Sequence, residues 1–141
     1  MKYSLYLVFL YFINGIYDKE IITHITFHYS HIDFLYFLFL AIQYYWCYQL
    51  YHTIYQYLSL YSFLCIRIKK KQYYKILCWQ FIKYMLIYIL VHSLYFWNLP
   101  IIMFYNLIIQ FIALLVTFKT LSKSEYSFMV MFIIIVVLHI F

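Results

Sequence analysis

The chain has 141 residues, of which 69% are apolar and 10% are charged, and its formal net charge is +6. Soluble domains average about 45–50% apolar and 25% charged residues, so a soluble fold of this size could not bury so much apolar surface. The basic residues are divided among several loops, which excludes the continuous basic face of a nucleic-acid-binding protein. We therefore expect an all-α membrane protein with a single integral membrane domain, residues 1–141.

The first segment, residues 1–17, is a basic start followed by an apolar run. It is similar to a signal peptide but lacks a small-residue cleavage site. Its length is at the short end for a membrane span. We interpret it as a membrane helix.

Residues 18–32 form the most polar connection of the chain. His24, His28 and His31 are spaced i, i+4 and i+7, which places them on one face of a helix, although the segment also alternates as an extended strand does. On a helix the three imidazoles could share a metal ion, with Asp33 as the only nearby residue to complete the ligand set. We expect an interfacial polar loop here, and the metal site is the alternative.

The longest apolar segment is residues 34–66, which contains no Gly, Pro or formal charge. We predict an essentially continuous helix of about 50 Å, longer than the ~30 Å hydrocarbon core of a bilayer. Trp favours membrane interfaces, and Trp46 lies about one bilayer thickness before Arg67, so residues 46–66 are predicted to span. Residues 34–45 would then project outward or lie flat, so that either the helix tilts strongly or another protein covers this apolar part. We expect another subunit to bury most of residues 34–42.

Three further apolar segments follow, separated by a basic loop, a turn and a polar loop. In chain order these are the loop 67–75, a span at about 76–97, the turn at Asn98, Leu99 and Pro100, a span at 101–118, the loop 119–125 and a final span at 126–141. Pro100 breaks one helix and can begin the next. The chain is thus predicted to be polytopic, with about five transmembrane helices.

The charges predict the orientation of these five helices. The loops 67–75 and 119–125 would share the side of the N-terminus, together with eight of the ten basic residues, while Asp18, Glu20 and Asp33 would lie on the other side. The positive-inside rule then places the N-terminus on the inner side. One lysine, Lys83, falls well inside a span, and we expect it to reach back to the interface or to meet a lipid phosphate or a partner's carboxylate.

The long apolar segment carries a polar stripe. Its members are spaced i, i+3, i+4, i+7 and i+10 and so lie on one helical face: Gln49, His52, Thr53, Gln56 and Ser59. Polar groups within a membrane face protein or a water-filled cavity, so we predict a helix-packing seam. The alternative is a proton or ion path, which the lack of a carboxylate in any span disfavours.

Three histidines, His52, His92 and His139, lie 15 to 17 residues from Arg67, Lys75 and Lys123 respectively, and so at a similar predicted depth. Two of them could ligate a haem, as in the membrane anchors of succinate dehydrogenase. The Asp-Tyr element of those anchors is missing here. We therefore expect interfacial histidines, no bound cofactor and no b-type absorbance spectrum.

The amino-acid usage is strongly biased. Phe, Tyr, Ile, Lys and Asn, whose codons are mostly A and T, make up half of the chain, whereas Gly and Ala occur only as Gly15, Ala41 and Ala113. This composition resembles that of the lineage-specific orphan reading frames of ciliate mitochondrial DNA, the ymf group. The resemblance covers the whole chain without a family motif, and it implies a hydrophobic protein made in mitochondria and inserted into their inner membrane.

Catalytic motifs are missing from the sequence, and its four acidic residues all lie near loops. We therefore expect a non-catalytic accessory or structural subunit of a respiratory-chain complex, namely complex I, complex IV or a supercomplex, that contributes helix packing and assembly. A haem- or quinone-binding anchor and an ATP synthase membrane subunit are the alternatives. The expected partners are other membrane subunits and phospholipids, cardiolipin among them, near Arg67, Lys69, Lys70, Lys71 and Lys83.

Overall fold

A computed structural model describes residues 2–29, 31–60, 66, 68–97, 99–121 and 126–140, and it omits the side chains of Lys2, Gln56, Leu58, Ser59 and residues 118–121. All regular structure in these ranges is α-helical, as expected for the fold class. The six helices are α1 (Lys2–Asn14), α2 (Lys19–Phe27), α3 (Phe34–Ser59), α5 (Lys70–Tyr95), α6 (Ile101–Leu121) and α7 (Ser127–Ile140).

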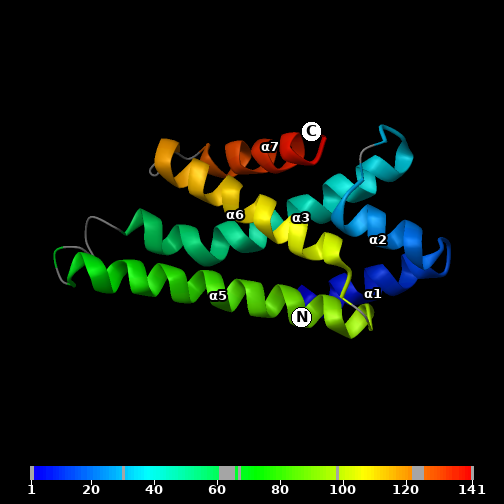
Figure 1. Ribbon diagram of the computed structural model, residues 1–141, viewed down its shortest axis with the longest axis horizontal. Helices are drawn as coiled ribbons and strands as arrows, with labels where there is room; N and C mark the ends of the chain where they lie inside the picture. Colours follow the sequence, from blue (N-terminus) through cyan, green and yellow to red (C-terminus); the bar gives the residue numbers. More distant parts are fainter. Residues whose placement is uncertain are drawn as a thin grey trace.

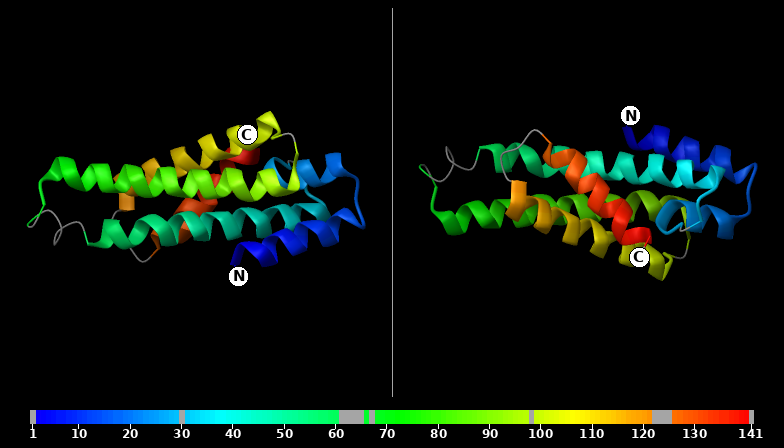
Figure 2. Two further views of the ribbon diagram at one scale, coloured as in Figure 1. Left: turned by 90° about the horizontal axis from the view of Figure 1, so that it is seen from below. Right: turned by 90° about the horizontal axis from the view of Figure 1, so that it is seen from above.

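The two 26-residue helices α3 and α5 lie side by side along the long axis of the molecule, each about 39 Å long (Figures 1 and 2). Helix α7 packs against α3 and α6, while α1 and α2 lie at the end where α3 begins and α5 ends. Hydroxyl groups join the long pair to the others: the Tyr6 hydroxyl contacts His92, and the Tyr51 hydroxyl contacts the Ser127 hydroxyl at 3.2 Å.

Two helix starts agree with the sequence analysis. Helix α6 begins directly after Pro100, whose carbonyl accepts a hydrogen bond from Met103 N–H. Helix α3 begins directly after Asp33, whose Oδ1 accepts the N–H groups of Leu35 and Tyr36 at 2.9 and 3.2 Å. The Tyr29 hydroxyl donates to the other carboxylate oxygen at 2.6 Å. This hydrogen bond holds the pKa of Asp33 below its ordinary value.

The polar segment 18–32 is a helix from Lys19 to Phe27 rather than an extended strand or an irregular loop. Its buried residues are Ile22, Ile25, Thr26 and Phe27, whereas Lys19, Glu20 and His24 are exposed. Burial of both Ile22 and Ile25 favours the period of 3.6 over the alternation of a strand, because alternation would place these two side chains on opposite faces.

The predicted long helix is shorter than expected. Helix α3 continues without a break from Phe34 past Gln49, as predicted, but it ends at Ser59, and residues 61–65 lie outside the described ranges. The use of Trp46 as an interface marker is wrong, because its side chain is buried between α1 and α5 against Tyr6 and Tyr88. Tertiary packing has overridden the interfacial preference of the indole.

The outward side of α5 is a continuous apolar stripe. Its members are exposed and recur every three or four residues: Trp79, Ile82, Leu86, Leu90, Leu94 and, just beyond the helix, Trp97. Lys83 lies exposed beside them. Within the described residues α5 is the one helix whose length and hydropathy suffice to cross a membrane, whereas Tyr3–Asn14, Ile101–Thr117 and Ser127–Ile140 are apolar but shorter.

Candidate functional site

Polar side chains gather in the interior of the bundle, where α2, α3, α5 and α6 meet. Five of them are fully buried, at 0–1% exposure: Thr26, Gln43, His92, Asn106 and Gln110. Burying an amide without a hydrogen-bond partner is costly, so the pairing of these groups decides whether the arrangement is stable.

A hydrogen-bonded chain crosses the bundle from α5 to α2. The Tyr84 hydroxyl donates to Gln110 Oε1 at 2.5 Å, Gln110 Nε2 donates to Asn106 Oδ1 at 2.8 Å, and Asn106 Nδ2 donates to the Phe27 carbonyl at 3.2 Å. Asn106 and Gln110 can bond because they are spaced i, i+4 on α6. This series of hydrogen bonds connects the neighbouring helices α5 and α6 to α2, which is far from them in the sequence.

The same groups cap the end of α2. The last carbonyls of a helix have no partner within the helix. Here the Phe27 carbonyl accepts from Asn106, and the Thr26 carbonyl accepts from Gln43 Nε2 at 3.0 Å. Two amides from α6 and α3 therefore satisfy the backbone at the point where this nine-residue helix stops. Such satisfaction is required where a helix ends inside an apolar medium.

His92 lies in an aromatic cluster on the same buried face of α5, two helical turns after Tyr84. Its Nδ1 is 2.8 Å from the Tyr88 carbonyl, which can only accept, so Nδ1 carries a proton. In the neutral ring Nε2 is then the acceptor for the Tyr6 hydroxyl at 3.1 Å. The Trp46 and Phe27 rings pack against the imidazole at 5.1 and 5.0 Å between centroids. Both ring nitrogens are thus engaged within the protein.

The predicted polar stripe of α3 is separate from this network. Gln49 is buried and His52 is exposed, while the Thr53 hydroxyl donates to the Gln49 carbonyl of its own helix at 2.7 Å. The side chains of Gln56 and Ser59 lie outside the description. The packing seam therefore stays a prediction.

The three histidines considered for haem have different surroundings. His52 is exposed beside Tyr48, whereas His92 and His139 are buried. His139 Nδ1 bonds to the Ile135 carbonyl at 2.7 Å, and its ring lies 6.0 Å from that of His28. For His92 to ligate iron through Nε2, it would first have to lose the Tyr6 hydrogen bond.

The residues His24, His28 and His31 share one pocket of about 430 Å³, which Ile21, Tyr29 and Leu35 also line. Helix α2 ends before His28, so the three rings do not follow one helical face. Asp33, the one nearby residue that could have completed a ligand set, bonds to Tyr29 and to the start of α3. Across the described ranges, no group of three or more His, Cys, Asp or Glu residues could hold a metal ion.

The sequence analysis overlooked the residues that form the buried network: Thr26, Gln43, Tyr84, Asn106 and Gln110. One signal was present in the sequence, since Asn106 and Gln110 are the only amides of the segment 101–118 and stand one helical turn apart. Nothing in the sequence indicated that Asn106 would donate to a backbone carbonyl of α2 or that Gln110 would accept from the Tyr84 hydroxyl.

Comparisons with known proteins add no relative: no protein-family model, no curated protein and no solved structure matches the chain.

Proposed function

We propose that this chain is a polytopic membrane protein that serves as a non-catalytic structural or accessory subunit of a respiratory-chain complex in the mitochondrial inner membrane. The observation that carries the proposal is the distribution of polar groups. Gln43 of α3 and Asn106 and Gln110 of α6 are buried, and each donates a side-chain hydrogen bond, whereas large apolar side chains are exposed on α5, α6 and α7. This distribution suits a bundle surrounded by lipid or by apolar protein.

The direction of the helices supports a membrane orientation. Helices α1, α3, α5, α6 and α7 alternate in direction along the long axis, so that the ends of α3 and α6 and the starts of α5 and α7 lie together (Figure 1). The lysines at the start of α5 occupy this end, and the α1–α2 connection with its acidic neighbours lies at the other. Charge at both ends and apolar sides between them is the pattern of a membrane-embedded bundle.

The start of α3 supports a place within a larger assembly. Phe34 and Phe37 are 73% and 69% exposed, whereas Phe39 is buried beside His139 of α7. This chain therefore covers only one side of the first turns of α3, and the other side is left for lipid or a neighbouring subunit. The mitochondrial location and the assignment to the respiratory chain rest on the compositional resemblance.

Blue-native electrophoresis of mitochondrial membranes, with mass spectrometry of the band that contains this chain, tests the proposal. We expect the chain to migrate with the subunits of one respiratory complex. It should stay with them in a second electrophoresis under non-denaturing conditions. Recovery in a carbonate-extractable fraction, or in a band without respiratory subunits, would contradict it. Co-migration with ATP synthase subunits would select that alternative.

A further inference from the structure

We propose that a groove between α5 and α6 binds one acyl chain of an anionic phospholipid, whose phosphate lies between Lys71 and Lys75. The proposal rests on the membrane location proposed above and names a specific lipid site on that surface.

The groove is apolar throughout and has a volume of about 460 Å³, within the range of about 300–1,000 Å³ for ligand pockets. Helix α5 forms one wall through Leu77, Cys78 and Phe81, and helix α6 forms the other through Phe111 and Leu114. The buried Ile54 of α3 also lines it. No lining residue offers a charge, so the matching ligand segment is a hydrocarbon chain.

The two walls separate toward one end of the molecule. Near its middle α5 and α6 are held together by the Tyr84–Gln110 hydrogen bond and by the Phe81–Phe111 ring contact at 4.9 Å between centroids. From there α6 diverges from α5 toward the end where α5 begins (Figure 1). The groove lies in this diverging half, so it leads from the bundle interior toward the lysine-bearing start of α5.

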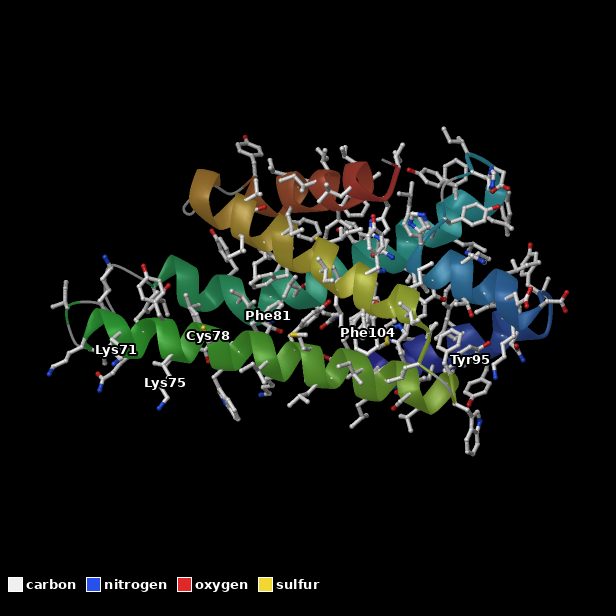
Figure 3. The ribbon with its side chains drawn as sticks, viewed as in Figure 1. Lys71, Lys75, Cys78, Phe81, Tyr95 and Phe104 are labelled. Atoms are coloured by element: carbon white, nitrogen blue, oxygen red, sulfur yellow. The ribbon has the colours of Figure 1, made fainter. Side chains whose placement is uncertain are left out.

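Lys71 and Lys75 stand at that end. Together with Cys78 and Ile82 of the groove they are spaced i, i+4, i+7 and i+11, so all four share one face of α5. Both lysines are exposed, and Figure 3 shows them on the turns of α5 that precede Cys78 and Phe81. A lysine stem can lie along apolar surface while its ammonium group reaches a phosphate.

The charges at this end favour an anion. Helix α5 begins at Lys70, so the positive end of its dipole adds to the ammonium groups. The described carboxylates, Asp18, Glu20 and Asp33, belong to the connections and the helix at the opposite end (Figure 1). An apolar groove that ends at two cations matches a chain attached to a phosphate, and a purely apolar partner helix would leave the cations unpaired.

The test uses the full chain in nanodiscs and a phosphatidylglycerol that carries a diazirine in one acyl chain. We expect crosslinks on the α5 peptide 74–82 and the α6 peptide 111–115. The double variant Lys71→Gln/Lys75→Gln should weaken capture of this probe roughly tenfold or more, since each lysine near a membrane surface favours anionic lipid severalfold. The variant Cys78→Trp, which fills the groove at an exposed position, should abolish the groove crosslinks.

Two variants away from the groove provide controls. Lys19→Gln removes an exposed charge from α2 at the opposite end of the molecule (Figure 1), and Leu86→Trp enlarges an exposed side chain of α5, both at positions that do not line the groove. Both should capture the probe as the natural chain does, with unchanged helicity by circular dichroism. Equal capture of a phosphatidylcholine probe, or crosslinks spread evenly over the outer faces of the helices, would overturn the lipid site but leave the membrane location intact. A chain that does not enter nanodiscs would instead contradict the proposed function.

Discussion

His92 shows at the level of one residue how polarity is accommodated in this core. Its imidazole is surrounded by the rings of Tyr6, Phe27, Trp46 and Tyr88, yet each nitrogen has a hydrogen-bond partner. The Tyr6 bond also ties α1 to α5 across 86 residues of sequence. Removing one partner would leave the other buried and unpaired, which costs more than an average hydrogen bond contributes.

We therefore expect Tyr6→Phe to lower the free energy of unfolding by about 1–3 kcal/mol, because Nε2 of His92 would lose its donor. Thermal unfolding in detergent, followed by circular dichroism, measures this effect. Tyr11→Phe is the matched control on the same helix, since Tyr11 is 58% exposed. Equal melting temperatures for the two variants would contradict the role given to the Tyr6 hydroxyl.

Asp33 is a second residue with a defined task, at the start of α3. Its carboxylate accepts from Tyr29 and from two backbone N–H groups, and these bonds lower its pKa from the ordinary value of 3.8. A depressed folded pKa means that the stabilisation is complete above the unfolded pKa and is lost as the pH falls through the folded pKa.

Limited proteolysis of the α2–α3 connection at several pH values tests this. We expect protection at pH 7, and a loss of protection as the pH falls below about 4. Asp33→Ala should be cleaved faster at pH 7, whereas Asp33→Asn, which can still cap the helix, should be cleaved at an intermediate rate that does not change with acidification. If Asp33→Asn instead loses its protection on acidification as the natural chain does, another titrating group is responsible.

At the level of elements, α2 is the helix that depends most on its neighbours. With nine residues it is too short to be stable alone, and its last carbonyls are satisfied by amides from α3 and α6. Its amphipathic face and the two amide caps together explain why the chain forms a helix here and not a polar loop.

We expect Asn106→Leu to loosen α2 while the long helices stay intact, because the Phe27 carbonyl would lose its donor and Gln110 its acceptor. Amide hydrogen exchange followed by mass spectrometry should show faster exchange for residues 19–28 and no change in the middle of α5. A cost of about 1–3 kcal/mol predicts exchange roughly 5- to 150-fold faster. Ser93→Ala, which removes an exposed hydroxyl bonded only to the Leu90 carbonyl, is the control. The idea fails if exchange in α2 is the same in both variants.

Local signals predicted the elements whose boundaries depend on nearby residues. Asp33 and Pro100 mark the starts of α3 and α6 because a cap and a helix-starting proline act within one turn. The position of Trp46 and the pairing of Gln43 with Thr26 could not be predicted, since both depend on which helices become neighbours. A single sequence shows that a polar residue lies in an apolar run, but it does not identify the partner.

At the level of the whole molecule, the ends carry charge and the sides are apolar, which agrees with the orientation proposed from the loops. We expect the start of α5 to face the matrix. A single cysteine at Lys70, in a chain with Cys47, Cys65 and Cys78 replaced by serine, should be labelled by a membrane-impermeant maleimide only in inverted inner-membrane vesicles. A single cysteine at Asp18, near the opposite end, should show the reverse behaviour. Labelling of both positions from one side would rule out the alternating orientation.

The outward stripe of α5 also indicates the thickness of the bilayer that would match this helix. Trp79 lies 16 residues before the end of α5 at Tyr95, or about 24 Å along the helix, and Trp97 lies two residues beyond that end. This length is somewhat less than the ~30 Å hydrocarbon core of a bilayer. Indole rings anchor at the boundary between acyl chains and head groups. If α5 spans the membrane as proposed, we expect a thicker membrane to thin around this helix and a thinner one to let it tilt. Reconstitution in lipids of graded chain length should give the highest thermal stability where this mismatch disappears.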